Sequence, residues 1–285
     1  MNQAIPVTVI GGYLGSGKTT LVNHLLRNAN GKRLAIMVNE FGELPIDEDL
    51  IEATGDDIIS LAGGCVCCSF GSDLMEAMTA LSKLSPKPDN VILEASGVAL
   101  PGTIAGTLSL LPGFAVDGVL VLVDAETIRT LASDKYMADT IKRQLADADL
   151  VLVNKIDLVS GDALEALWGW LPALAPNAKI IETERSVAPS SVVLQNFIQS
   201  DPDKFSGVFE HGVGFETRLL TVEECVDANK FAQALIIENP RLVRAKGFVN
   251  DVGGHMKTIQ IVGKRFEIST APESVSSGLV LILSP

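Results

Sequence analysis

Residues 12–19 read G-x-x-x-x-G-K-T, a spacing typical of loops that bind the phosphates of a nucleotide. The apolar run 7–10 before them predicts a strand, and leucines at helical spacing after them predict a helix. In this setting the glycines allow backbone N–H groups to turn toward phosphate oxygens, and the helix N-terminus adds about half a positive charge. We expect the Lys18 ammonium to reach the β- and γ-phosphates and the Thr19 hydroxyl to bind Mg²⁺. The alternative is a glycine-rich turn that binds nothing.

A carboxylate and a glycine form a second motif one α/β unit downstream. The apolar run 90–94 ends in Glu94, and Gly97 completes the pattern E-x-x-G. A strand-end acid opposite the phosphate-binding loop can act on the Mg²⁺ shell or on water, and the glycine N–H can approach a γ-phosphate. We therefore expect Lys18 and Glu94 to serve catalysis and Gly97 to contact the nucleotide.

Residues 154–157 read N-K-x-D and directly follow the apolar run 151–153. The Asp157 carboxylate can accept hydrogen bonds from N1 and the exocyclic amine of guanine, a donor pair that adenine lacks. Asn154 can connect this loop to the phosphate-binding loop, and the aliphatic stem of Lys155 can cover the face of the base. The pattern favours a guanine nucleotide; the alternative is a polar loop without a ligand.

Three of the four cysteines, Cys65, Cys67 and Cys68, lie within four positions. Thiolates are ligands for Zn²⁺, Cu(I) and similar ions, and on an extended chain Cys65 and Cys67 point the same way. Tetrahedral zinc needs four ligands, so further donors must come from the third thiol, water, or the acidic loop that carries Glu40 and Glu43. An open ligand shell suits a metal carrier. The alternatives are redox-active thiols, an inert cluster, or a structural zinc knuckle.

The predicted elements place these motifs in an α/β domain. Strand-like runs alternate with amphipathic segments, which predicts a mostly parallel sheet with helices on both faces. One helix can be capped by Ser72 or Asp73 and ends before Pro86, and another is expected at 101–111. The predicted strands are residues 7–10, 33–39, 57–61, 90–94, 117–124, 151–153 and 178–182.

A second, smaller domain is expected after this one. We predict that the first domain spans residues 1–185, that a linker rich in Pro and Gly spans 186–214, and that 215–285 form an α+β domain with an antiparallel sheet. Its predicted strands are 242–249, 256–262, 265–269 and 279–283. We expect Asn229 to cap its helix and Cys225 to be a small core residue.

The composition narrows the class of protein. The chain has 285 residues and a net charge of −13, which argues against nucleic acid or an anionic membrane as its main partner. No signal peptide is visible, and no apolar run approaches the roughly 20 residues that span a bilayer. We therefore expect a cytoplasmic protein, in which clustered cysteines seldom form structural disulfides.

These motifs, in this order, resemble the CobW-type family of P-loop GTPases, whose members are regarded as metallochaperones or metal-centre insertases. The runs N-E-F-G-E at 39–43, G-G-C-x-C-C at 63–68 and R-A-K-G-F at 244–248 extend the resemblance over nearly the whole chain. The resemblance implies a CobW-like second domain, and GTP, Mg²⁺ and zinc or cobalt as ligands, with a metal-requiring client protein as partner. The implied GTP phosphate ligands are Gly15, Ser16, Gly17, Lys18, Thr19 and Thr20; the guanine ligands are Asn154, Lys155 and Asp157; the metal ligands are Cys65, Cys67 and Cys68.

The chain departs from the family in two respects. Many relatives carry a histidine-rich run, whereas this chain has three histidines, which argues against metal storage by a histidine tail. The pattern E-x-x-G keeps its acid and glycine but varies the residues between them.

The motifs together suggest a coupled mechanism. GTP and Mg²⁺ would order the loop 40–49, which occupies the place of a GTPase switch, and the thiolates would hold metal until hydrolysis releases it. We expect slow intrinsic hydrolysis, since no evident arginine or glutamine finger is present. The alternatives are a GTP-dependent redox sensor or assembly factor whose thiols carry no metal, and a nucleotide kinase.

Overall fold

The computed structural model describes residues 4–38, 58–62, 72–194, 214–272 and 275–285. The chain divides into two compact units, Met1–Ala188 and Pro189–Pro285, which are described separately below. No helix in the described ranges is long and apolar enough to cross a membrane.

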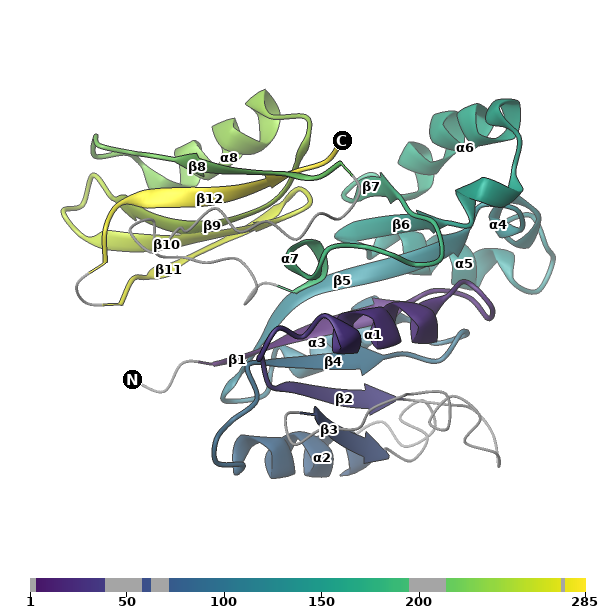
Figure 1. Cartoon of the computed structure of the whole chain (residues 1–285), viewed down its shortest axis with the longest axis horizontal. Helices are drawn as coiled ribbons and strands as arrows, with labels where there is room; N and C mark the ends of the chain where they lie inside the picture. The colour runs from purple at the N-terminus through teal and green to yellow at the C-terminus, as the bar shows by residue number, and fades with distance from the viewer. Residues whose placement is uncertain (1–3, 39–57, 63–71, 195–213, 273–274) are drawn as a thin grey trace. The chain divides into compact units, whose positions relative to one another are not determined.

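The first unit is built on a seven-stranded sheet in the order β3-β2-β4-β1-β5-β6-β7, and every pairing in it is parallel (Figure 1). This confirms the predicted α/β class. The strands are β1 (Ile5–Gly11), β2 (Leu34–Val38), β3 (Ile58–Ala62), β4 (Asn90–Glu94), β5 (Phe114–Asp124), β6 (Leu150–Asn154) and β7 (Lys179–Glu182).

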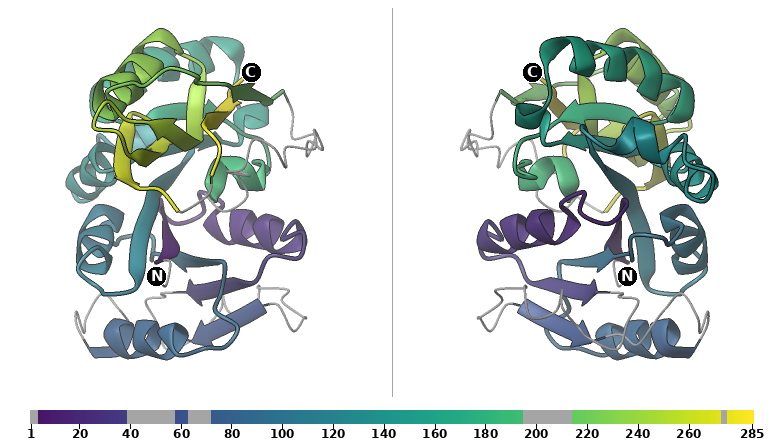
Figure 2. Two further views of the ribbon diagram at one scale, coloured as in Figure 1. Left: turned by 90° about the vertical axis from the view of Figure 1, so that its left-hand side faces the viewer. Right: turned by 90° about the vertical axis from the view of Figure 1, so that its right-hand side faces the viewer.

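The helices of this unit follow the strands in alternation. They are α1 (Lys18–Arg27), α2 (Ser72–Ser82), α3 (Pro101–Leu108), α4 (Ile128–Leu131), α5 (Ala138–Ala146) and α6 (Gly161–Leu174), with the 3₁₀ turn η1 (Ile156–Leu158) after β6. Figure 2 shows α1 and α3 on opposite sides of the sheet. The predicted helix at 101–111 is shorter than expected, because β5 begins at Phe114 and the chain must turn through Gly113, which has φ of +86°.

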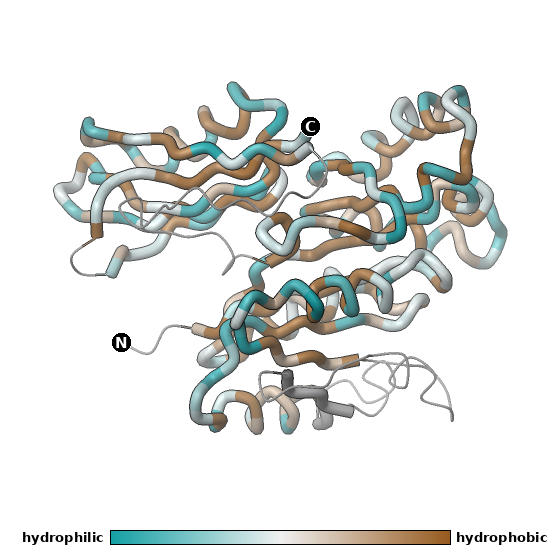
Figure 3. Tube along the Cα trace, viewed as in Figure 1, coloured by the Kyte–Doolittle hydropathy of each residue, from teal (hydrophilic) through white to brown (hydrophobic). Residues whose placement is uncertain are grey.

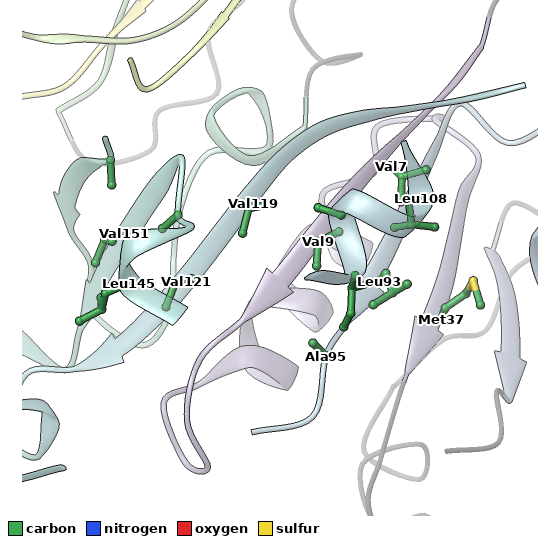
Figure 4. Close-up of a cluster of buried hydrophobic side chains, with 14 of the residues drawn as sticks. Val7, Val9, Met37, Leu93, Ala95, Leu108, Val119, Val121, Leu145 and Val151 are labelled. Atoms are coloured by element: carbon green, nitrogen blue, oxygen red, sulfur yellow. The ribbon is translucent and has the colours of Figure 1, made fainter. Parts of the chain in front are cut away.

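Burial explains why these segments form a parallel sheet. All seven residues of β1 and all five of β6 are buried, as expected for strands covered on both faces. Val7 and Val9 point to the face covered by α3 and α5, where they join Leu93, Leu108, Val121 and Leu145 in one cluster (Figure 4). The hydropathy colouring shows the apolar residues concentrated along these strands (Figure 3).

Parallel strands bring the sequence motifs to one edge of the sheet. The register pairs Ile10 with Glu94 and Asp124 with Asn154, so β1 and β4 end together, β5 and β6 end together, and all four end at the same edge of the sheet. The loops after these strands are the phosphate-binding loop, the segment after Glu94 and the N-K-x-D segment. Because the carboxyl ends of strands in an open α/β sheet surround its ligand sites, this edge is the place to look for function.

The second unit contains the predicted antiparallel sheet, with five strands in the order β11-β10-β9-β12-β8. Helix α8 packs on one face through Ala228, Ala232 and Leu235. The strands are β8 (Glu216–Leu220), β9 (Leu242–Asn250), β10 (Met256–Val262), β11 (Arg265–Thr270) and β12 (Gly278–Leu283), and the helices are α7 (Ser190–Val193) and α8 (Ala228–Glu238).

Two expectations for this unit are wrong. Cys225 is exposed rather than buried, because the chain around it makes a single bridge, between Val226 and Asp251, and not a full strand. The cap of α8 is Asp227 and not Asn229: the Asp227 carboxylate accepts hydrogen bonds of 3.1 Å from the backbone N–H groups of Asn229 and Lys230. The N-cap of a helix is the residue whose side chain accepts hydrogen bonds from the free backbone N–H groups of the first turn.

Candidate functional site

The phosphate-binding loop has the backbone conformation that its glycines predict. Gly12, Gly15 and Gly17 have φ of +132°, +75° and +105°, values that other residues rarely adopt. A Cβ on Gly12 would lie 2.3 Å from the Leu122 carbonyl oxygen, so β5 leaves room only for glycine there. A Cβ on Gly15 would have no atom within 4 Å, so this part of the loop borders open space.

Helix α1 presents its N-terminus at this loop. It begins at Lys18 directly after Gly17, and its first turn contains no acidic side chain. The N-terminus of a helix favours negative charge, so this end of α1 suits an anionic ligand. Lys18 is buried, and its Nζ lies 3.4 Å from the carbonyl oxygen of Tyr13 within the loop. Thr20, two residues after Lys18, is exposed.

Thr19 and Glu94 are joined by a hydrogen bond. The Thr19 hydroxyl donates to Oε1 of Glu94 over 3.0 Å, and Glu94 is only 2% exposed. Hydroxyl and carboxylate oxygens are the hard ligands that Mg²⁺ prefers. These two side chains, from the start of α1 and the end of β4, therefore fit a magnesium ion beside the phosphate-binding loop.

The segment after Glu94 packs closely against the phosphate-binding loop. The N–H of Ala95 donates to the Ile10 carbonyl over 2.8 Å, which continues the strand pairing. Gly97 is buried, and a Cβ there would lie 2.7 Å from the Leu14 side chain and 2.8 Å from its backbone nitrogen. Within the described residues, the hydroxyls of Ser16 and Ser96 are buried without a hydrogen-bond partner. Buried hydroxyls without a hydrogen-bond partner are available to bind a ligand at this site.

Asn154 connects the N-K-x-D segment to the phosphate-binding loop, as expected. Its Nδ2 donates to the Ser16 carbonyl over 2.9 Å and to Ser186 Oγ over 2.8 Å. Lys155 adopts a left-handed conformation with φ of +62°, and its Nζ forms an ion pair of 2.6 Å with Asp124 at the end of β5. Asp157 follows in η1 with its side chain exposed. Its carboxylate is therefore open to a base that approaches this edge.

Ser186 belongs to this site although its sequence context did not suggest it. Its N–H donates to Asn154 Oδ1 over 2.8 Å, and its hydroxyl donates to the Gly17 carbonyl over 2.9 Å. Ser186 is completely buried and, like Arg185, has a positive φ. A signal was available: Ser186 follows the strand that neighbours β6, so the chain had to return to the edge that carries Asn154.

The predicted metal ligands Cys65, Cys67, Cys68, Glu40 and Glu43 lie outside the described residues, as does His211. Within the described residues, no group of three His, Cys, Asp or Glu side chains could hold a metal ion.

Strands β2 and β3, which precede the acidic loop and the cysteine run in the sequence, belong to the part of the chain that the structure describes. The register pairs Val38, at the end of β2, with both Ala62 and Glu94. The described ends of β2 and β3 therefore lie at the same edge of the sheet as Glu94.

Comparison with known proteins agrees with this arrangement. Residues 6–182 match the family described as CobW/HypB/UreG, nucleotide-binding domain. A zinc chaperone CobW from a Sinorhizobium species is 30% identical over 306 residues, which cover 92% of this chain and 86% of that protein. The zinc chaperone CobW of Pseudomonas aeruginosa is 30% identical over 329 residues, covering 98% and 87%.

Among solved structures, the zinc-bound YjiA GTPase of Escherichia coli has the same fold. Its TM-score is 0.52 at 21% sequence identity, and the match covers all of this chain and 95% of that one.

Proposed function

The chain belongs to the CobW/HypB/UreG family, and on that premise we propose that it is a GTP-binding, GTP-hydrolysing metallochaperone that carries zinc to a client protein. Cobalt is the alternative cargo. The observation that carries the proposal is the network in which Asn154 and Ser186 join the N-K-x-D segment to the phosphate-binding loop. The long, well-covered matches to proteins named zinc chaperones support the cargo.

The geometry of the base site supports guanine over adenine. Asp157 is exposed at the sheet edge, where its carboxylate can accept from two adjacent N–H groups of guanine. The ion pair between Lys155 and Asp124 holds the lysine stem at the same edge. Adenine offers no such donor pair, and a carboxylate that the bound base covers and leaves without donors would be costly.

Hydrolysis would use residues from helix α1, the end of β4 and the segment that follows β4. Lys18 would bind the β- and γ-phosphates, and the backbone N–H of Gly97 would approach the γ-phosphate. Thr19 and Glu94 would hold Mg²⁺, which supplies charge neutralisation at the phosphates when it is bound. Glu94 would also orient the attacking water.

We expect the intrinsic turnover to be slow. The segments 12–17, 95–100 and 155–160 contain no arginine that could stabilise charge in the transition state. A client or another partner would then supply the missing group.

The metal would be bound by Cys65, Cys67 and Cys68, with Glu40 or Glu43 as a further donor. The pairing of Val38 with both Glu94 and Ala62 supports coupling between the two sites, because the strands that precede the donor-bearing segments in the sequence end beside Glu94. A ligand that orders this edge would favour convergence of the thiolates, and loss of the γ-phosphate would favour metal release.

The decisive experiment measures zinc affinity by competition with a chelator in two states, one with a GTP analogue and one with GDP. We expect tighter zinc binding with the analogue, and by linkage tighter analogue binding with zinc. Replacing Cys65, Cys67 and Cys68 with serine should abolish zinc binding, whereas Cys225→Ser, at the exposed fourth cysteine, should not. Equal zinc affinity in the two states would refute the coupling.

A GTP-dependent redox sensor or assembly factor is the competing function, and the three clustered thiols are what favour it. Oxidation of the thiols would then change nucleotide binding without added metal. The same titration repeated with an oxidant and a strong chelator separates the two functions.

A further inference from the structure

Gln144 is a polar residue in the middle of an otherwise apolar helix face. It lies on α5 beside Ile141 and Leu145, and all three side chains are 1% exposed. Its Nε2 donates to two backbone carbonyls, that of Gly97 over 3.1 Å and that of Ala99 over 2.7 Å. Both partners are acceptors, so the amide must present its NH₂ group to them.

A buried amide at this position needs a reason. Ile141 and Leu145 contribute to the main core cluster, and a leucine or methionine between them would extend that cluster without any polar atom to desolvate. The amide instead uses both of its N–H groups on one short segment. The amide of Gln144 therefore serves to hold the backbone of residues 97–99 and not to pack α5.

The segment that Gln144 holds lies between two fixed points. Ala95 is hydrogen-bonded to Ile10, and at the other end the ring of Pro101 packs so closely on Gly11 that a Cβ there would lie 2.6 Å from it. Between these points Gly97 contacts Leu14 of the phosphate-binding loop. The N–H of a trans peptide points opposite to its C=O, so a Gly97 carbonyl that faces α5 turns the Val98 N–H away from α5.

We infer that Gln144 is a positioning residue that holds Gly97–Ala99 in the arrangement that receives the γ-phosphate. It thereby sets the preference of the protein for GTP over GDP. This inference rests on the proposed function, because it requires that the nucleotide binds at the phosphate-binding loop with its γ-phosphate at Gly97. GDP has no group at that position, so its binding does not depend on Gln144.

The test compares Gln144→Met with Leu145→Ala. Methionine keeps the length of the side chain and its apolar contacts but cannot donate to the two carbonyls. We expect about tenfold weaker binding of a non-hydrolysable GTP analogue, unchanged binding of GDP, and a fall in kcat larger than any change in KM for GTP. Leu145→Ala removes core packing from the same helix and should lower the melting temperature while leaving the ratio of the two affinities unchanged.

Equal losses for the analogue and for GDP in Gln144→Met, or a shifted ratio in Leu145→Ala, would overturn the inference, because either result would make Gln144 a general support of α5. If the wild-type protein binds neither nucleotide, the proposed function fails instead.

A measurement on the wild-type protein covers the case in which Gln144→Met does not fold. With ¹⁵N-labelled glutamine, the side-chain amide signals of Gln144 should shift when the GTP analogue binds and should keep their positions when GDP binds. Identical spectra in the two states would refute the inference without any variant.

Discussion

Thr19 and Glu94 are 75 positions apart in the chain, yet the hydroxyl of one donates to the carboxylate of the other over 3.0 Å. The parallel pairing of β1 with β4 produces this contact, because it aligns Ile10 with Glu94 and leads β1 into the loop that precedes Thr19. Two oxygen donors that fit the proposed Mg²⁺ site are thus brought together by the strand register.

Substitutions at these two positions should test the magnesium site and the further role of Glu94 in hydrolysis. Thr19→Ala should weaken Mg²⁺-dependent binding of a GTP analogue by about tenfold, because one oxygen ligand is lost, and Thr19→Ser should restore it. Glu94→Gln should lower kcat roughly a hundredfold, since the amide cannot accept a proton or carry the charge that faces the ion. Magnesium titrations and single-turnover GTP hydrolysis measure the two effects. Wild-type turnover in Glu94→Gln would remove Glu94 from the mechanism.

Base specificity gives a second prediction. Asp157→Asn exchanges one carboxylate oxygen for an NH₂ group, which cannot accept from the exocyclic amine of guanine. We expect GTP affinity to fall by about a hundredfold or more. Xanthine carries a carbonyl where guanine carries this amine, so the new amide should bind XTP better than the wild-type protein does.

Competition of GTP, XTP and ATP against a fluorescent nucleotide measures the affinity of each variant for the three bases. Leu158→Ala, an exposed neighbour in the same 3₁₀ turn, serves as the control. A variant that loses GTP without gaining XTP would show that Asp157 supports the loop rather than reading the base.

The motifs of the nucleotide site were predictable because each is local. The spacing of glycines, Lys18 and Thr19 determines a turn between a strand and a helix, and the apolar runs on either side determine where the sheet lies. Asn154 could be assigned to the same edge because strands of a parallel sheet end together. The cap of α8 shows the limit of this reasoning, since Asp227 and Asn229 are both good capping residues and only the backbone path decides between them.

Ser186 and Gln144 could not be predicted in this way. The sequence indicates that the chain returns to this edge near Ser186, but the contacts of Ser186 depend on a left-handed turn at Arg185 and Ser186, and neither residue type predicts that turn. Gln144 resembles any polar residue on an amphipathic helix until the packing of α5 brings it to the carbonyls of 97 and 99. Cys225 was misassigned because its apolar neighbours suggested a strand that the chain does not form. Each case depends on contacts between distant segments.

The Ser186 network gives a third prediction. Ser186→Ala removes the hydroxyl that donates to the Gly17 carbonyl and accepts from the side-chain amide of Asn154. We expect the free energy of unfolding to fall by about 1–3 kcal/mol and GTP and GDP to bind more weakly by similar factors. Thermal or urea unfolding and nucleotide titration measure these effects. Ser109→Ala is the matched control, because its exposed hydroxyl donates to the Gly106 carbonyl at the end of α3, and its loss should change stability by less than about 0.5 kcal/mol.

The close approach of Gly97 to Leu14 gives a fourth prediction. A Cβ at position 97 would lie 2.8 Å from the backbone nitrogen of Leu14, which cannot move aside as a side chain could. Gly97→Ala should therefore displace the segment from the phosphate-binding loop and weaken binding of the GTP analogue by about tenfold, with a smaller effect on GDP. Gly106→Ala, at a helical position where a Cβ meets nothing within 4 Å, is the control and should bind both nucleotides normally.

Combining Gly97→Ala with Leu14→Ala shows which part of Leu14 causes the effect. If the backbone contact dominates, removing the Leu14 side chain will not restore binding of the analogue. Full recovery in the double variant would mean that the side chain alone excludes a residue larger than glycine. In that case the Leu14 backbone would not constrain the position of the segment at Gly97 relative to the γ-phosphate.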